Sequence, residues 1–211
     1  MAKVNGGLSR RQLQSATTRE EIVRAAAELF TERGYVSTTI EAISTAAGVA
    51  VQTIYNSVGN KVALLNAVLD FTVAGPQTPA SVPQFMRART DAAMSVDAVI
   101  EILADWFVEV NGRSAGVFAL IRQAGAIDPE VAELERKRSA QRLKNYEGAA
   151  ARVRALGGLG AAVSDTEAAA AIWTIAHPDV YRALTAEGGM SQKAYRRWLD
   201  FVLRGVLQAQ P

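Results

Sequence analysis

Apolar residues recur at helical spacing along most of the chain, and glycine or proline separates one run from the next. The first helix is expected to begin at Thr17 or Thr18, each of which has a glutamate three residues later, and to end at Gly34. One face of this run is apolar and comprises Ile22, Ala25, Ala26, Leu29 and Phe30. Because strand-like alternation never persists, the pattern predicts an all-α protein.

Two short helical segments follow, with a tight turn between them. Thr38 or Thr39 can cap the first segment, which ends at Gly48, and the second covers 50–56. Gly48 tolerates a positive φ, and the two alanines before it let the helices cross closely. The pair indicates a helix-turn-helix, whose second helix lies in the major groove of DNA. An isolated Ala-Ala-Gly-Val also occurs in ordinary turns, so this segment alone does not decide between the two interpretations.

The rest of the chain is also predicted to be helical, apart from a connector at 75–79 and a glycine-rich loop at 157–160. Helices are expected near 61–73, 82–93, 95–111, 114–125, 128–156, 164–176 and 191–208, with a break and a short helix at His177 and Pro178. The expected amino-terminal caps are Ser95, Ser114, Asp128, Ser164 and Ser191. The mixed charges of 128–156 favour a solvated surface helix over a second nucleic-acid site.

The composition excludes several classes of function. The 211 residues include no cysteine, which rules out disulfides, thiolate metal sites and a cysteine nucleophile. His177 is the only histidine, and beside a proline it is interpreted as a hydrogen-bonded structural residue. Without a phosphate-binding glycine loop or a paired-carboxylate motif, the sequence predicts neither an enzyme nor a bound cofactor or metal. No apolar stretch is long enough to span a membrane, so a cytoplasmic location is expected.

Positive charge is concentrated at the N-terminus, whereas the net charge of the chain is only +2. The first nineteen residues contain no acidic residue and four basic ones: Lys3, Arg10, Arg11 and Arg19. Residues 1–16 are therefore expected to form a flexible basic arm that can contact a phosphate backbone. A plain solvated terminus is the alternative.

From Thr17 to Leu65 the sequence resembles the DNA-binding domain of the TetR family of bacterial transcriptional regulators. Five motifs in one order and spacing carry the resemblance: Leu29-Phe30-Thr31-Glu32-Arg33-Gly34-Tyr35, Thr38-Thr39-Ile40, Ala47-Gly48-Val49, Thr53-Ile54-Tyr55, and Lys61 before Leu64-Leu65. The resemblance implies a helix-turn-helix domain over 17–60 and a helical ligand-binding and dimerisation domain over 61–211. It also implies a homodimeric repressor that leaves a palindromic operator when a small-molecule effector binds.

The expected DNA contacts combine side-chain chemistry with the roles that the resemblance implies. Amides on the second short helix can pair with adenine, and an aliphatic side chain there can touch a thymine methyl. A tyrosine, a lysine and the amino end of the first short helix suit phosphates. The residues in these roles are Thr39, Val51, Gln52, Thr53, Tyr55, Asn56 and Lys61. Ala50 departs from the family pattern, because it leaves the recognition helix without a side-chain cap worth about 1 kcal/mol.

Two further sets of residues are candidates for effector and partner contacts. Aromatic residues that could line an effector pocket are Phe71, Phe85, Trp106, Phe107, Phe118 and Trp173, although each can equally be ordinary core. Few ionisable residues lie on these faces, so an apolar or aromatic effector is expected. The apolar stripe of the last helix and the alanine-rich helix before it give the dimer candidates, which are Ile172, Tyr195, Trp198, Phe201 and Val202. Packing of both faces within one subunit is the alternative.

Two other classes of protein remain alternatives to a sensor: an architectural DNA-binding protein and an enzyme. An apolar ligand that raises the melting temperature would favour the sensor over the architectural protein. Turnover of a substrate would be needed to favour the enzyme.

Overall fold

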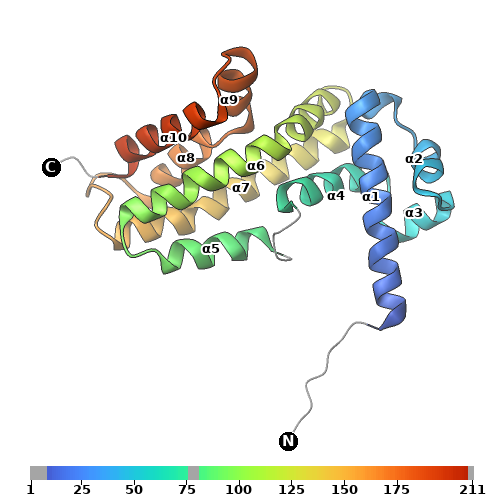
Figure 1. Cartoon of the computed structure of the whole chain (residues 1–211), viewed down its shortest axis with the longest axis horizontal. Coiled ribbons are helices and arrows are strands. Elements are labelled where there is room, and N and C mark those ends of the chain that lie inside the picture. The colour runs from blue at the N-terminus through green and yellow to red at the C-terminus, as the bar shows by residue number, and fades with distance from the viewer. Residues whose placement is uncertain (1–8, 76–80, 209–211) are drawn as a thin grey trace, which may run out of the picture.

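A computed structural model describes residues 9–75 and 81–208, and within these ranges the regular elements are all helices (Figure 1). The chain is therefore all-α, as the periodicity predicts. The elements are α1 (Arg10–Ser37), α2 (Ile40–Ala47), α3 (Val51–Ser57), α4 (Lys61–Ala74), α5 (Val82–Ala92), α6 (Val96–Gly125), α7 (Pro129–Ala155), α8 (Asp165–Ile175), α9 (Pro178–Arg182), a π-helical turn (Ala183–Glu187) and α10 (Gln192–Leu207). The described residues do not include the first eight residues of the expected arm, which contain Lys3. They also do not include 76–79 of the expected connector.

The helices build two apolar cores that meet along α4 and α6. The N-terminal core joins α1 to α4 with the end of α6 and the start of α7, through Ile121 and Val131. The C-terminal core joins α6, α7, α8 and α10, and its fully buried members include Phe107 and Leu199. In Figure 1 the long helices α6 and α7 run the length of the C-terminal part, with α5 on one side and α8 to α10 on the other. Val73 of α4 packs against both cores, so α4 connects them.

The first helix begins earlier than the sequence predicts. It starts at Arg10, where the hydroxyl of Ser9 accepts a hydrogen bond from the Gln12 N–H and the Gln12 side chain accepts one from the Ser9 N–H. The expected start at Thr17 or Thr18 is wrong, because Thr17 lies within the helix and donates its hydroxyl to the Leu13 carbonyl. Residues 10–16 of the expected flexible arm are therefore helical. Gly34 interrupts the helix as predicted, with φ 76°.

The two helices expected at 95–111 and 114–125 form one continuous helix, α6. Ser114 is not a cap: its hydroxyl is buried and donates to the Val110 carbonyl one turn earlier. The expected caps Ser95, Asp128, Ser164 and Ser191 are confirmed, since each side chain accepts a hydrogen bond from a backbone N–H in the first turn of its helix.

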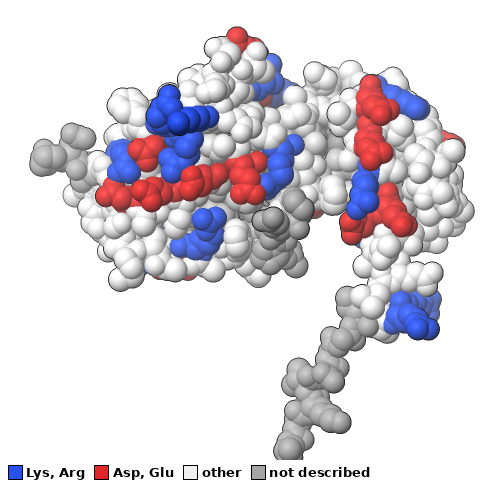
Figure 2. Space-filling model, in the orientation of Figure 1, with Lys and Arg blue, Asp and Glu red and all other residues white. Residues whose placement is uncertain are grey.

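A row of acidic residues on α6 helps to hold α10 in place. Asp97, Glu101, Asp105 and Glu109 recur every fourth residue, are exposed, and form a red band across the C-terminal part in Figure 2. Arg204 and Arg196 of α10 bind Asp97 and Asp105, respectively. These ion pairs flank the apolar contact in which Leu199 and Leu203 of α10 are fully buried, and this contact decides which side of α10 remains exposed.

Candidate DNA-binding surface and ligand cavity

The helix-turn-helix consists of α2 and α3, joined at Gly48. Gly48 adopts the left-handed conformation with φ 65° and ψ 30°, as the sequence predicts. Thr39 caps α2 by accepting a hydrogen bond from the Ala42 N–H. Ile43 of α2 and Ile54 of α3 are fully buried in the N-terminal core. This packing turns the opposite side of α3 to solvent.

The exposed side of α3 carries Gln52, Tyr55 and Asn56. The Gln52 side-chain Nε2 donates to Asn56 Oδ1 at 3.0 Å, so the two amides lie together one turn apart. The side-chain oxygen of Gln52 and the NH₂ group of Asn56 take no part in this bond. Val51 and Thr53 are half-buried, and Val51 packs against the N-terminal core rather than standing free. Ala50 makes no side-chain cap, as predicted.

Two basic residues are tied to the helix-turn-helix in ways that the sequence did not show. Lys61 lies with Nζ 4.2 Å from the centroid of the Tyr35 ring and 3.4 Å from the Val36 carbonyl oxygen, and burial lowers its pKa. Arg19 donates from α1 to the Ser57 carbonyl at the end of α3. Arg19 is therefore held beside the end of α3, whereas Lys61 is held against the end of α1.

A pair of arginines lies at the free end of α1. Arg10 and Arg11 form its first turn, are exposed, and appear as a blue group at that end in Figure 2. Further along α1, the exposed residues Glu21, Glu28 and Glu32 give the face seen in Figure 2 an acidic character. Arg10 and Arg11 thus place positive charge at the end of α1 that projects past α3 (Figure 1), whereas the exposed Arg24 and Arg33 lie among the acidic residues further along the helix.

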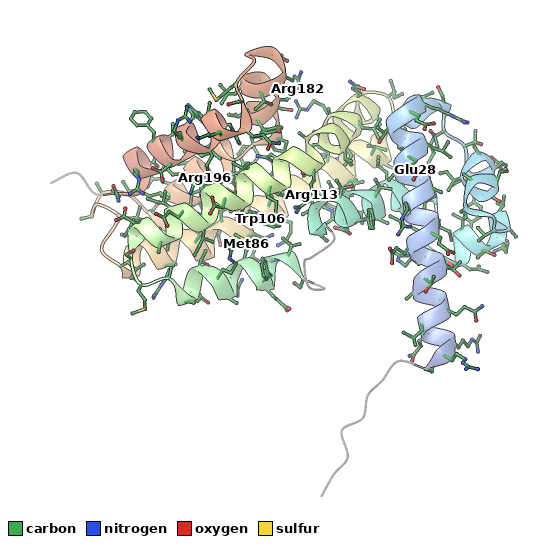
Figure 3. All side chains as sticks on the ribbon, viewed as in Figure 1. Glu28, Met86, Trp106, Arg113, Arg182 and Arg196 are labelled. Carbon is green, nitrogen blue, oxygen red and sulfur yellow. The ribbon has the colours of Figure 1, made fainter. Side chains whose placement is uncertain are left out.

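A cavity of about 470 Å³ lies in the C-terminal part, between α4, α5, α6 and α7, with the start of α9 at its edge. Its volume is in the range of small-molecule sites. Most of its wall is apolar and includes Leu69, Val73, Val82, Met86, Leu103, Trp106, Val110 and Phe118. Met86 of α5 and Trp106 of α6 lie side by side in Figure 3. The polar and charged residues of the wall include Asp70, Arg87, Thr90, Asn111, Arg138, Gln141, Arg142, Asn145 and Tyr146.

Two of the six aromatic pocket candidates, Trp106 and Phe118, line this cavity. The other four lie elsewhere. Phe107 is fully buried in the C-terminal core, where its ring meets Tyr146 edge-on at 5.7 Å. Trp173 packs edge-on against His177 at 5.0 Å. Phe71 is exposed on α4, and Phe85 lies on α5 beneath the Arg89 guanidinium.

The expectation that few ionisable residues face the pocket is wrong. Arg138 and Arg142 of α7 both line the cavity. They were assigned to a solvated surface helix because α7 carries many charges of both signs. Their sequence pattern contains a usable signal, since Arg138, Arg142 and Tyr146 recur every fourth residue and so share one face.

Helix α4 links the cavity to the helix-turn-helix. Its first half is buried in the N-terminal core through Leu64 and Leu65, whereas Leu69 and Val73 reach the cavity. Arg113 of α6, labelled in Figure 3, donates to the Thr72 and Val73 carbonyls at the end of α4, at 3.2 and 2.9 Å. Arg138 of α7 donates to Asn66 and Asp70 on α4.

A second contact joins the N-terminal and C-terminal parts of the molecule at the start of α7. The Tyr35 hydroxyl donates to Asp128 Oδ2 at 2.9 Å, and Asp128 Oδ1 accepts hydrogen bonds from the N–H groups that begin α7. This hydrogen bond from Tyr35 is the main cause of the lowered pKa of Asp128. The end of α1 and the start of α7 are therefore directly connected.

The dimer candidates fall into two groups. Ile172 and Tyr195 are fully buried within the single chain, so they belong to the C-terminal core and cannot contact a second copy. Tyr195 accepts a hydrogen bond from Asn111 Nδ2 at 3.3 Å. Phe201 is 76% exposed, and Trp198 and Val202 are half-buried on the neighbouring face of α10.

The lone histidine has a structural role in this fold. His177 Nδ1 accepts a hydrogen bond from the Asp179 N–H at 3.2 Å and so caps α9. Burial and the nearby Arg142 lower its pKa. Within the described ranges 9–75 and 81–208, the acidic and histidine side chains form no group of three that could hold a metal ion. None of the helices described there is long and apolar enough to cross a membrane.

Comparisons with known proteins place this geometry in context. Residues 22–68 match the family described as "Bacterial regulatory proteins, tetR family". No curated protein matches the chain. Solved structures with a similar fold include the SmeT–triclosan complex, which is 22% identical, with 91% of this chain and 92% of that chain covered and a TM-score of 0.70.

Two further solved structures have the same fold. NalD, the secondary repressor of the MexAB-OprM multidrug efflux pump in Pseudomonas aeruginosa, is 20% identical, with 94% of this chain and 100% of that chain covered and a TM-score of 0.69. Salmonella enterica GusR is 22% identical, with 90% and 95% covered and a TM-score of 0.66. At these identities the likeness concerns the fold.

Proposed function

We propose that this chain, whose residues 22–68 match the tetR family of bacterial regulatory proteins, is a repressor of that family that leaves its operator when an effector binds. The observation that carries the proposal is the course of α4. One half of this helix lies in the core of the helix-turn-helix, and the other half forms part of the wall of a 470 Å³ cavity. A ligand that moves α4 also moves the DNA-binding surface.

Base recognition is assigned to the amides on α3. Gln52 and Asn56 are exposed and adjacent, so together they present donors and acceptors suited to adenine edges in the major groove. Tyr55, Lys61 and the amino end of α2 at Thr39 are assigned to phosphates. Val51 and Thr53 are half-buried, so only the exposed part of each side chain is assigned to DNA. The main contact of this kind is between the Val51 methyl groups and a thymine methyl.

A division into two domains is also part of the proposal. We place the DNA-binding domain up to residue 60, and include in it the part of α1 that begins at Arg10. Residues 61–211 form the ligand-binding and dimerisation domain. Arg10 and Arg11 at the free end of α1 are positioned to add sequence-independent attraction to phosphates.

A homodimer is proposed through α8 and α10. Phe201, Trp198 and Val202 form an apolar strip along α10, and strips of this kind on a soluble protein mark a contact surface. The outer face of α8 offers the small exposed residues Ala170 and Thr174, which allow close approach. A dimer with twofold symmetry presents two α3 helices to one palindromic operator.

The effector is proposed to be a small, largely apolar or aromatic molecule. The wall of the cavity is mainly aliphatic and aromatic, with Trp106 and Phe118 among its rings. SmeT, which shares the fold, was solved with triclosan. The protein would act in the cytoplasm as a regulator without catalytic activity.

Selection of bound sequences from random DNA tests the DNA-binding half of the proposal. The selected sites should be imperfect palindromes whose half-sites lie about one duplex turn apart, or a near multiple of it. Sites without twofold symmetry would contradict the dimer. An architectural protein would also bind DNA, but no ligand would raise its melting temperature or release it from the selected site.

A further inference from the structure

One face of α7 lines the cavity with polar groups. Arg138, Arg142 and Tyr146 recur every fourth residue, so they lie one above another along the wall. Arg138 is already paired, since it donates to Asn66 and Asp70 on α4. Arg142 has no hydrogen-bond or ion-pair partner among residues 9–75 and 81–208, and its Nε is buried without an acceptor. A charged group thus faces the cavity uncompensated.

The surroundings of Arg142 hold its guanidinium in place without neutralising it. Its Cζ lies 5.1 Å from the centre of the Phe118 ring and 5.4 Å from that of Trp173. The nearby carboxylate of Asp179 is bound to Arg122. Burial lowers the pKa of Arg142, although a guanidinium stays protonated in proteins. A partly buried cation without an anionic partner is unfavourable, and pairing with an anion relieves this cost.

A second polar group lies one turn further along the same face. Burial raises the pKa of Tyr146 to about 12, so its hydroxyl is neutral at physiological pH and can donate a hydrogen bond. Its ring is fixed by the edge-on contact with Phe107. Beyond these two groups, the wall consists largely of Met86, Trp106 and other apolar side chains.

We propose that the cavity takes an apolar carboxylate, whose anionic group pairs with Arg142 and accepts a hydrogen bond from Tyr146 while its hydrocarbon part packs against the apolar wall. The fork of the guanidinium matches the two oxygens of a carboxylate. A doubly charged phosphate is a poorer fit, because Arg138 is engaged by Asp70 and Arg87 is exposed to water. This inference rests on the proposed sensor function and specifies the class of its effector.

The test compares carboxylates with neutral molecules of the same shape. The probes are 2-naphthoate and octanoate, each paired with its primary amide, and binding to the full-length protein is measured by calorimetry. Wild type is expected to bind at least one carboxylate about tenfold more tightly than its amide. Arg142→Gln should abolish this preference while leaving amide binding unchanged. Tyr146→Phe should reduce the preference in part.

Two further variants guard against a merely structural effect. Arg136→Gln is the matched control, since it removes a cation from the same helix where the side chain is 74% exposed and faces solvent. This control should keep the preference of wild type. Arg142→Lys keeps the charge but loses the fork, and it should weaken carboxylate binding without changing amide binding. It also keeps the test decisive if the glutamine variant does not fold.

The inference is overturned if neither carboxylate binds wild type more tightly than its amide, or if Arg142→Gln retains the preference. If the amides bind as tightly as the carboxylates and release the selected operator, the proposed preference for a carboxylate is wrong. The proposed sensor function would still hold. A carboxylate preference lost in Arg142→Gln, but without operator release, would support this site and contradict the proposed coupling to DNA.

Discussion

Gln52 and Lys61 illustrate how neighbouring polar residues can serve different purposes. Gln52 is exposed and bonded to Asn56, so the two amides lie together on the outer side of α3. Lys61 lies over the Tyr35 ring, so its charge is held against the end of α1. We therefore expect Gln52 to contribute to base recognition and Lys61 to contribute sequence-independent attraction to phosphate.

Replacing these two residues separates the roles. Gln52→Ala should lose about 1–3 kcal/mol of binding free energy at particular base pairs. Lys61→Ala should lower the affinity for all DNA sequences alike, and should reduce the slope of log affinity against log salt concentration by about 1. Affinities for the selected operator and its point variants, measured at several salt concentrations, check both. Thermal unfolding of Lys61→Ala controls for the lost contact with Tyr35. A uniform loss for both variants, with unchanged base preference, would show that the roles are wrongly assigned.

Among the helices, α7 and α4 hold the two parts of the molecule together. Tyr35 at the end of α1 bonds to Asp128, the cap of α7, and Arg138 of α7 bonds to α4. Each contact is local in space but joins residues far apart in sequence. Weakening one of them should therefore lower stability without removing a helix.

Tyr35→Phe tests the first of these contacts. The variant keeps the ring that stacks on Phe30, and Asp128 still caps α7 through Oδ1, so the loss should be about 0.5–1.5 kcal/mol, that of one hydrogen bond. The bond lowers the pKa of Asp128, so its contribution is present above the ordinary pKa of 3.8 and is lost as the pH falls through the lowered value. Denaturant unfolding at neutral and acidic pH should show a difference that shrinks in acid. A difference that grows in acid would contradict this account.

At the scale of the whole molecule, the question is which surface meets a second copy. Phe201 is 76% exposed in the single chain, so a charge at this position costs nothing unless a partner covers it. Phe201→Glu should therefore produce a monomer in sedimentation experiments, because the dimer would bury an unpaired carboxylate. The monomer should also bind the palindromic operator much more weakly.

Met94 provides the matched control for this replacement. It is 86% exposed and belongs to the short link between α5 and α6, so it is part of neither α8 nor α10. Met94→Glu should remain a dimer with unchanged operator affinity. If Phe201→Glu also remains a dimer, the interface lies on another face of the molecule.

The sequence by itself determined the helices, most of their ends and the helix-turn-helix. Gly48 and Ser164 are identified correctly, and Thr39 is one of the two caps that the sequence allows for α2, because a cap or a left-handed turn depends on backbone groups within a few residues. The same local rule failed at Ser114, since a serine hydroxyl can instead bond back to the preceding turn of a continuing helix.

Only the tertiary structure decided which face of each amphipathic helix meets which neighbour. On α10, periodicity marked Tyr195 and Phe201 alike as apolar, but packing against α6 and α8 buries the first and exposes the second. On α7, the charge pattern indicated solvent, whereas the crossing of four helices places Arg142 in a cavity wall. Periodicity fixes the direction of a side chain relative to its own helix axis, and burial depends on what lies opposite, which is set by residues distant in the sequence.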